Sequence, residues 1–253
     1  MGIARYHVLI SRFSWPHPIW NDKTADQYSS WLSQRLELFE KYTIRSVKNL
    51  NKKPDIWMIM LGKHSNNFVD KLKTLLDDAG VNYKLIIFSN ISLVNSLKKA
   101  FSEFEVPCEI WSTRLDTDDL IACDYFTRVA SLDISEEMLT DGCGISFPGG
   151  VNYLANSDEF FFTAYPDNPF LTYAEIMSEN GVLKTVYFSM HTELLKKARH
   201  ATYLRSHYPM WASVIHGSNM ANNSLVQTCR IHLLEAGELK ARFGVHDKLV
   251  SDC

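Results

Sequence analysis

The sequence has few cysteines and no close cysteine pairs. Five cysteines are spread over 253 residues, and no two of them form a C-x-x-C pair. An odd number without close pairs argues against a disulfide framework and against a structural zinc site. We therefore expect reduced thiols, most of them in the core.

Several other features that define whole classes of protein are also missing. The 26 lysines and arginines nearly balance the 29 aspartates and glutamates, and no basic run marks a nucleic-acid groove. The apolar stretch near the start is too short for a secretory signal or a membrane span. We therefore expect a cytoplasmic protein with no nucleic-acid partner and no transmembrane segment, and peripheral association with a membrane stays open.

Short β-like runs alternate with segments of helical period in the first half of the chain. The strands are expected at residues 6–10, 56–61, 83–88 and 108–113, and the helices at 28–42, 68–79 and 92–104. This alternation is typical of βαβ crossovers. It predicts an α/β fold with a Rossmann-like, mostly parallel central sheet flanked by helices.

The second half is less regular. We expect helices at residues 119–131, 173–179, 191–199 and 223–235, a buried strand at 144–147, a hairpin at 151–165 and an apolar run at 209–215. No internal repeat and no low-complexity linker divides the chain. We therefore expect residues 1–253 to form a single domain.

The sharpest feature is an acidic cluster after the fourth expected strand. Asp116, Asp118 and Asp119 follow residues 108–113 directly. Ligands of open parallel sheets bind at the carboxyl ends of the strands, where three carboxylates repel one another unless a cation compensates. Mg²⁺ or Mn²⁺ takes carboxylate oxygens and bridges them to phosphates. The alternative is that Asp118 or Asp119 only caps a helix beginning near Leu120.

Other polar residues follow the same strand ends. Arg12 comes after the first strand, Ser89 and Asn90 follow the third, and Arg114 ends the fourth. A guanidinium group can bind a diphosphate through two hydrogen bonds. These residues are candidates for binding a nucleotide-sugar diphosphate together with Asp116, although Arg114 can instead pair with the neighbouring carboxylates.

Four stretches resemble a bacterial family of rhamnosyltransferases related to the GT-A glycosyltransferases. They read HVLISRFSW, WSTRLDTDD, NPFLTYAEIM and WASVIHGSN, and they run over most of the chain. The resemblance implies a GT-A-like fold in which residues 1–131 bind a nucleotide-sugar donor and 132–253 build the acceptor site. It also implies that Asp116 and Asp118 hold the metal and diphosphate, with Arg12 near the nucleotide. Ser14 departs from the asparagine common in this family.

A late histidine completes the expected metal site. His216 follows the apolar run 209–215 and precedes Gly-Ser-Asn, a composition that lets the backbone approach a ligand. GT-A-like enzymes often contribute such a histidine to the metal, so the resemblance implies Asp116, Asp118 and His216 as ligands. The alternative is a structural histidine at a strand end.

Two carboxylates are candidates for the general base that an inverting transfer needs. Glu175 lies in an otherwise apolar turn of the expected helix, where an unpaired carboxylate is costly. Asp158, in the expected hairpin turn, is the second candidate. Glu175 can instead be exposed on a helix face, and turns favour aspartate for local reasons.

The sequence therefore predicts a metal-dependent glycosyltransferase. It would move a hexose such as rhamnose from a nucleotide-diphosphate donor to a glycan or lipid-linked hydroxyl acceptor, as in surface polysaccharide synthesis. One alternative is a nucleotidyl- or phosphoryl-transfer enzyme, but no G-x-x-x-x-G-K-[ST] or G-x-G-x-x-G loop is present. The other is a non-catalytic sugar-binding protein of the same fold.

Overall fold

The computed structural model describes residues 3–15, 24–63, 68–88, 92–179, 183–216, 229–230 and 233–245. A seven-stranded sheet runs through the centre, in the order β10-β6-β9-β4-β1-β2-β3. Its strands are β1 (Ala4–Arg12), β2 (Ile56–Leu61), β3 (Tyr83–Ile87), β4 (Cys108–Arg114), β6 (Cys143–Ser146), β9 (Thr172–Met177) and β10 (His200–Tyr203). Only β9 runs antiparallel to its neighbours β4 and β6. The expected mostly parallel α/β sheet is confirmed.

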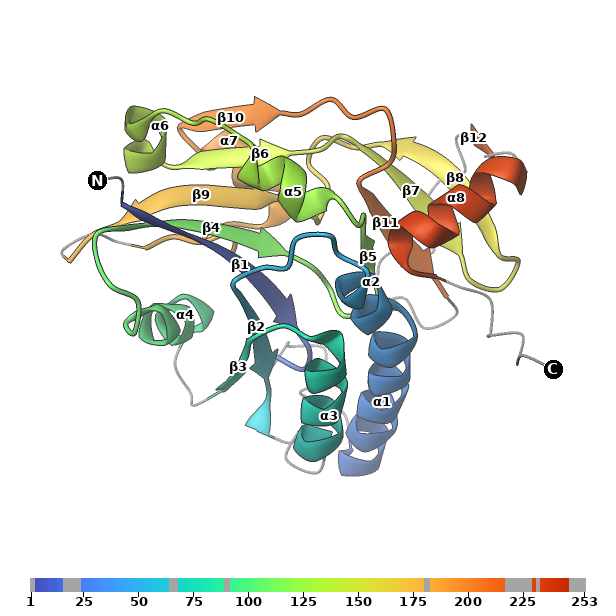
Figure 1. Ribbon diagram of the computed structural model, residues 1–253. Helices are drawn as coiled ribbons and strands as arrows, with labels where there is room; N and C mark the ends of the chain where they lie inside the picture. The colour runs from blue at the N-terminus through green and yellow to red at the C-terminus, as the bar shows by residue number, and fades with distance from the viewer. Residues whose placement is uncertain are drawn as a thin grey trace.

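A second, five-stranded sheet lies beside the first, in the order β12-β8-β7-β11-β5. Its strands are β5 (Leu120–Ile121), β7 (Gly149–Leu154), β8 (Glu159–Ala164), β11 (Trp211–Ile215) and β12 (Cys229–Arg230). Figure 1 shows it to the right of the central sheet, next to α8 (Leu233–Phe243). One buried apolar cluster contains both Leu9 of β1 and Val151 of β7, so the two sheets share a core.

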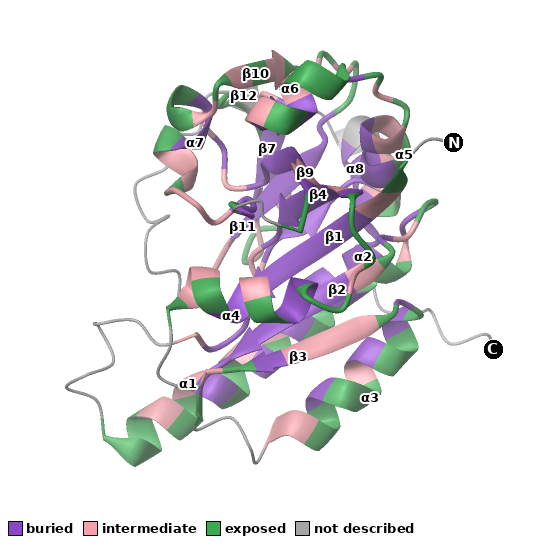
Figure 2. Ribbon diagram, turned by 90° about the vertical axis from the view of Figure 1, so that its left-hand side faces the viewer, coloured by how far each residue is buried: buried purple, intermediate pink, exposed green. Residues whose placement is uncertain are grey.

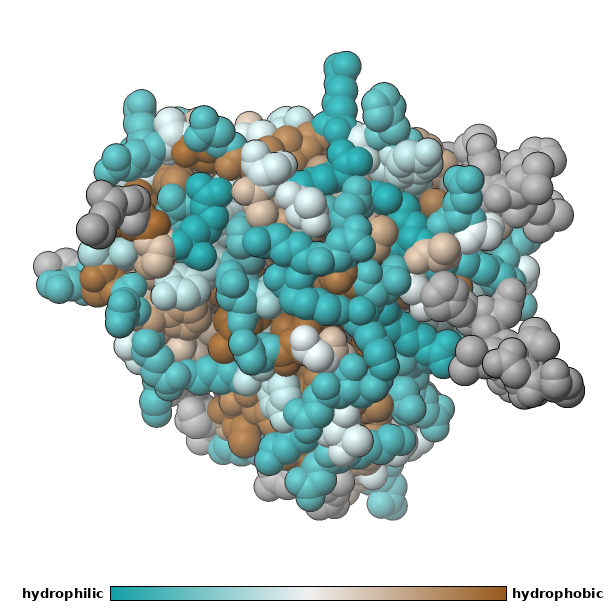
Figure 3. Space-filling view, in the orientation of Figure 1, coloured by the Kyte–Doolittle hydropathy of each residue, from teal (hydrophilic) through white to brown (hydrophobic). Residues whose placement is uncertain are grey.

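Helices cover both faces of the central sheet. The face with Leu9 and Trp57 packs against α1 (Ala25–Leu38), the π-helical turn η2 (Phe39–Ile44), α2 (Arg45–Lys48), α3 (Val69–Ala79), α5 (Tyr125–Ala130) and α6 (Glu136–Asp141). The opposite face packs against α4 (Leu93–Phe101) and α7 (His191–Lys197). Figure 2 shows the strands as the buried centre, and the face in Figure 3 is mostly hydrophilic.

Local sequence signals explain where several helices begin and end. Thr24 and Gln27 form a capping box at the start of α1, which satisfies amide groups left open by the first turn. Gly80 ends α3 in the left-handed conformation, with φ of 65°. The four strands and three helices expected in the first half, the hairpin and the helix at α7 are confirmed.

Three expected helices are wrong. Residues 119–131 contain β5 and the shorter helix α5, because Leu120 and Ile121 pair with β11. Residues 173–179 contain β9, whose nearly continuous burial comes from insertion between two strands of the central sheet. Tertiary pairing outweighs local helical spacing in both segments. Within the expected helix 223–235, residues 229–230 form β12 and 233–235 begin α8, and residues 223–228 and 231–232 lie outside the described residues.

Candidate functional site

The acidic cluster lies at the carboxyl edge of the central sheet, where β4 ends beside β1. Leu115 donates its backbone N–H to Ile10 O, so the chain keeps pairing with β1 for one residue beyond β4. Thr43 of η2 then donates its hydroxyl to Asp119 O at 3.0 Å. The helix α1–η2–α2 is thereby fastened against the acidic segment.

Asp116 is bound by two arginines. Arg114 contacts both of its oxygens, from Nε at 3.4 Å and from Nη2 at 2.6 Å, and Arg12 Nη2 lies 3.8 Å from Oδ1. Burial alone would raise the pKa of Asp116, but the Arg114 and Arg12 charges outweigh it and hold the pKa well below its usual range. Asp116 therefore stays ionised and orients the two guanidinium groups.

Asp118 faces the second sheet, where it meets the histidine expected at the metal. His216 Nε2 lies 3.2 Å from Asp118 Oδ2. Arg35 of α1 approaches the same oxygen at 4.0 Å and packs over the Trp31 ring. The structure therefore brings together two of the expected metal ligands, Asp118 and His216, from positions 98 residues apart.

Asp119 is buried and fixes the second sheet to the first. Its Oδ1 accepts the backbone N–H of Val214 in β11 at 3.0 Å. Burial and the charges of Asp118 and Asp116 raise the pKa of Asp119 well above its usual range. No helix begins at Leu120, so the expected alternative that the cluster only caps a helix is wrong.

An aromatic ring and a second histidine lie next to the arginines. The Tyr187 ring is 5.4 Å from the guanidinium carbon of Arg12 and 5.7 Å from that of Arg114, distances typical of cation–π contacts. His191 Nδ1 lies 3.2 Å from Arg114 Nη1. Burial, reinforced by Arg114, lowers the pKa of His191 to about 4, so the ring is neutral and accepts this hydrogen bond.

The loop after β1 is held by close packing rather than by a long polar side chain. Ser14 is buried and its hydroxyl accepts the N–H of Gly62 at 2.9 Å. A Cβ atom at Gly62 would lie 2.5 Å from Ser14 O, so only glycine fits there. Serine at this position therefore fits a tight contact between the ends of β1 and β2. The candidates Ser89 and Asn90 lie outside the described residues.

Glu175 lies on β9 and not on a helix. Its oxygens accept the backbone N–H of Lys184 at 2.9 and 3.1 Å and that of Thr185 at 2.6 Å. In the β4–β9 register Glu175 pairs with Ile110, whereas Thr172 pairs with Thr113 near the strand end. At about 3.3 Å per residue, this places Glu175 about 10 Å down the strand from the carboxyl edge. The structure does not bring it next to Asp116 and Asp118.

Asp158 lies in the turn between β7 and β8, as expected, with φ of 56°. Its Oδ1 accepts the Tyr153 hydroxyl at 2.8 Å, and its Oδ2 pairs with Lys240 of α8. Burial would raise the pKa of Asp158, but the hydrogen bonds from Lys240 and Tyr153 lower it. These contacts link the hairpin to α8.

The spacing of Asp118 and His216 fits two ligands of one divalent cation. Among the described residues, no group of three or more His, Cys, Asp or Glu side chains is placed to hold a metal ion by itself. Asp118 Oδ2 and His216 Nε2 are 3.2 Å apart. Two ligands bound at about 2.1 Å and about 90° apart lie about 3 Å from each other. The pair therefore fits two neighbouring ligand positions, with phosphate oxygens and water for the rest.

A carboxylate cluster, arginines and a histidine at the carboxyl edge of a mostly parallel sheet define a candidate phosphate-binding site. The chain belongs to a glycosyltransferase family: residues 1–228 match the family described as "Putative rhamnosyl transferase". Among curated proteins, no sequence matches this chain. No helix in the described part of the chain is long and apolar enough to cross a membrane.

Solved structures resemble the chain only distantly. HddC from Yersinia pseudotuberculosis is 13% identical, with a TM-score of 0.42 over 79% of this chain and 90% of that chain. The inositol-1-phosphate CTP transferase from T. maritima is 12% identical, with a TM-score of 0.41 over 83% and 89%. TarS 1-349 from S. aureus, in complex with UDP, is 10% identical, with a TM-score of 0.44 over 83% and 60%.

The sequence interpretation missed Arg35 and Tyr187, and it did not select His191. Arg35 lies on a helix that approaches the edge from outside the sheet, and Tyr187 and His191 come from a loop and helix on the opposite face. None of them follows a strand, so the rule about strand ends could not find them. The available signal for Arg35 was a charged residue among the apolar positions of 28–42.

Proposed function

We propose that this chain is a metal-dependent glycosyltransferase. It transfers a hexose, with rhamnose as the sugar of the family description, from a nucleotide-diphosphate donor to a hydroxyl of a glycan or a lipid-linked acceptor. The synthesis of surface polysaccharides is the process that this reaction would serve. Family membership supports the class of reaction, and the site geometry supports the donor.

The observation that carries the proposal is the contact between Asp118 and His216 beside the Arg12–Asp116–Arg114 group. A diphosphate needs positive charge along its length, and here cationic side chains stand next to a pair of metal-binding donors. Arg12 is 38% exposed at its side chain and Arg114 11%, so Arg12 is the more open to a ligand. This arrangement has the composition expected for binding the diphosphate of a nucleotide sugar.

Each residue has a role that follows from its contacts. Asp118 and His216 would hold Mn²⁺ or Mg²⁺, which when bound supplies positive charge to the leaving diphosphate. Arg12 and Arg114 add charge to the same group, and Asp116 keeps them in place. The carboxylates of Glu175 and Asp158 are engaged in contacts that hold the fold, so the mechanism assigns them no proton transfer.

The test measures nucleotide binding and donor breakdown together. A thermal-shift panel of nucleoside diphosphates with and without Mn²⁺ should show stabilisation that depends on both the nucleotide and the metal, because a ligand of the folded state raises its stability. The matching nucleotide sugar should then release free sugar and nucleoside diphosphate slowly. Pyrophosphate release from a nucleoside triphosphate and a sugar phosphate would instead indicate nucleotidyl transfer. If no nucleotide stabilises the protein, the result would favour a non-catalytic protein of the same fold.

A further inference from the structure

Glu175 fastens the loop of residues 183–190 to the central sheet. The Glu175 carboxylate accepts the Lys184 and Thr185 amides, and the Ser112 hydroxyl on β4 accepts the Val186 amide at 2.8 Å. Glu175 is 5% exposed and Ser112 is fully buried, so water does not replace these contacts. Three consecutive amides of the loop are therefore bound to side chains of β9 and β4.

The points of attachment lead toward the candidate site. Side chains of alternate residues lie on one face of a strand, so Ser112 and Arg114 share a face of β4. The loop contacts Glu175 first, then Ser112, and next Tyr187 reaches the level of Ile10 O, which its hydroxyl approaches at 3.5 Å. Tyr187 therefore lies beside Arg114, and the backbone amides of the two residues before it, Thr185 and Val186, are bound to the sheet.

The backbone of the loop is strained at one residue, which several hydrogen bonds hold in place. Thr185 has φ of 62°, a left-handed conformation that β-branched residues rarely adopt. Such a residue persists only where its surroundings determine it. Here Glu175 binds the Thr185 amide, the Thr185 hydroxyl accepts the Tyr187 amide at 3.3 Å, and the Thr185 carbonyl accepts the Phe188 amide at 3.1 Å.

Tyr187 is the residue of this loop whose ring contacts both arginines. Its ring contacts Arg12 at the end of β1 and Arg114 at the end of β4. Arg12 also pairs with Asp116 at 3.8 Å, so the carboxylate and the Tyr187 ring together limit where its guanidinium can lie. An arginine held in place loses less freedom when an anion binds.

We infer that Glu175 is a positioning residue for the diphosphate site: through the loop of residues 183–190 it places the Tyr187 ring, which orders Arg12 and Arg114 for an anionic ligand. This inference rests on the proposed function, because it takes the ligand to be a diphosphate. Glu175, which the sequence indicates as a candidate base, would then act at a distance from the reacting atoms.

The test compares five proteins: the wild type, Glu175→Gln, Tyr187→Leu, Tyr187→Phe and the control Glu109→Gln. Glu109 is a partly buried carboxylate on neighbouring β4 that binds Arg5 and Trp111 and, by alternation along the strand, lies on the opposite face of β4 from Ser112. Three quantities are measured: affinity for inorganic pyrophosphate with Mn²⁺ by calorimetry, affinity for Mn²⁺ alone by electron paramagnetic resonance, and hydrogen exchange of the Lys184 and Thr185 amides.

Glu175→Gln replaces one accepting oxygen with an NH₂ group facing an amide donor, so both amides should exchange faster and pyrophosphate should bind about tenfold more weakly. Tyr187→Leu should weaken pyrophosphate to a similar extent, whereas Tyr187→Phe, which keeps the ring, should stay within about threefold of the wild type. Affinity for Mn²⁺ alone should stay within about twofold in all variants, because Asp118 and His216 are untouched. A general loss of structure would lower both affinities.

Unchanged pyrophosphate affinity in Tyr187→Leu, or in a Glu175→Gln protein whose loop amides exchange faster, would overturn the inference. If Glu175→Gln does not fold, the two Tyr187 variants still decide whether the ring orders the arginines. A wild-type protein that binds neither pyrophosphate nor any nucleoside diphosphate would overturn the proposed function itself, which is a different result from normal binding in the variants.

Discussion

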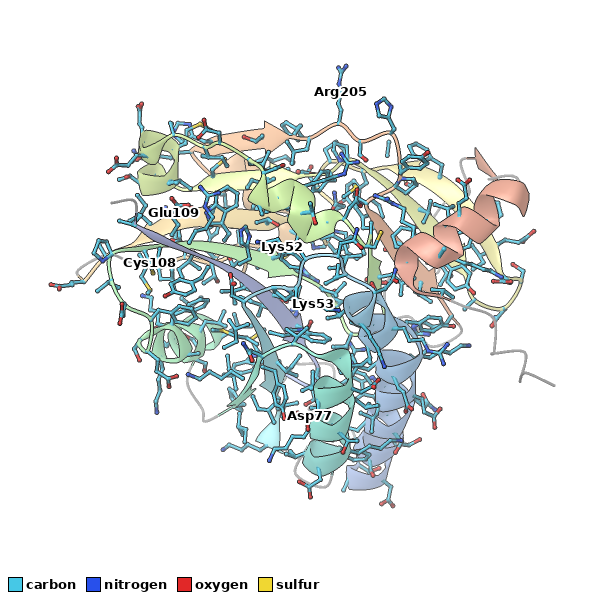
Figure 4. All side chains as sticks on the ribbon, viewed as in Figure 1. Lys52, Lys53, Asp77, Cys108, Glu109 and Arg205 are labelled. Carbon is cyan, nitrogen blue, oxygen red and sulfur yellow. The ribbon has the colours of Figure 1, made fainter. Side chains whose placement is uncertain are left out.

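The amino and carboxyl edges of the central sheet carry the same kinds of side chain, but these side chains have different roles. At the amino edge, Arg5 pairs with Glu109 at 2.5 Å and lies over the Trp111 ring at 4.4 Å. Figure 4 shows Glu109 there, at the left-hand end of β4. At the carboxyl edge, Arg114 pairs with Asp116 at 2.6 Å and lies over Tyr187 at 5.7 Å. Each edge therefore has an arginine, a carboxylate and an aromatic ring.

The edges differ in how their charges are distributed. Glu109 accepts hydrogen bonds from Arg5 and from the Trp111 indole, and Arg5 also donates to the Leu132 carbonyl at 3.4 Å. The carboxyl edge instead crowds Asp116, Asp118 and Asp119 into four positions, and their mutual repulsion contributes to the raised pKa of Asp119. Crowded like charges cost stability unless a ligand relieves them. The comparison indicates that an ion pair alone is not a sign of a binding site. Carboxylates in excess of their cationic partners, as at the carboxyl edge, are the more informative feature.

The largest effect is expected from changing Asp118, the carboxylate that we propose binds the metal. Asp118→Asn should weaken Mn²⁺-supported binding of a nucleoside diphosphate by more than about a hundredfold, beyond the usual loss for a residue that only supports a ligand. The folded structure should persist, because Asp118 is not part of the apolar core. The matched change at the other edge is Asp55→Asn, which alters a carboxylate that accepts the His7 amide at 2.7 Å. Equal binding by Asp118→Asn and the wild type would refute the assignment.

The next effect concerns stability in acid at the amino edge. His7 is 4% exposed, its Nδ1 has no hydrogen-bond partner, and burial lowers its pKa from 6.5 to about 4. A lowered pKa means that stability is present above pH 6.5 and is lost as pH falls through 4. The loss should reach about 3 kcal/mol. Between pH 7 and 4, the free energy of unfolding of His7→Phe should fall by about 3 kcal/mol less than that of the wild type, as measured by denaturant unfolding. An equal fall in both proteins would contradict the assignment.

A pair of conservative replacements compares the two arginines directly. Arg114→Lys keeps the charge but loses the forked contact with Asp116, so diphosphate affinity should fall about tenfold. Arg5→Lys should leave that affinity unchanged and lower the free energy of unfolding by about 1 kcal/mol, because it loses packing over Trp111. Calorimetry and denaturant unfolding measure the two quantities. Equal diphosphate affinities in Arg114→Lys and Arg5→Lys would contradict the proposed difference between the two edges.

The smallest effect is a change of metal preference. Imidazole nitrogen is a better partner for Mn²⁺ than for Mg²⁺. His216→Ala should therefore weaken Mn²⁺-supported nucleotide binding several-fold more than Mg²⁺-supported binding. A crystal structure with Mn²⁺ and a nucleoside diphosphate gives an independent check: a His216 ring more than about 4 Å from the ion would exclude it from the shell.

Periodicity was sufficient to predict the first half of the fold, because β1, β2 and β3 are each followed by a helix that packs back on the sheet. It failed for residues 173–179, since the apolar spacing of Tyr173, Ala174 and Ile176 suits a helix and a buried strand equally. Insertion of β9 between β4 and β6 is a long-range pairing that no local window contains.

The site residues that directly follow strands could be predicted from the sequence, whereas those contributed by other loops and helices could not. Arg12, Arg114 and the aspartates follow from strand ends, and the family resemblance suggested that His216 joins them. Tyr187 could not be found this way, because its position depends on Glu175 and Ser112 binding the amides of its loop. A carboxylate in an apolar segment indicates that something must bind it, but the partner here is the backbone.

The π-helical turn η2 has a consequence for how this protein can vary among relatives. It joins α1 to α2, so Arg35 before it faces Asp118 while Thr43 and Ser46 contact the acidic segment and Ile121. Deleting one residue from 39–44 would restore an α-helix and turn its two halves by about 100° relative to each other. One set of contacts would then be lost, so descendants of this sequence should accumulate substitutions in η2 far more readily than insertions or deletions.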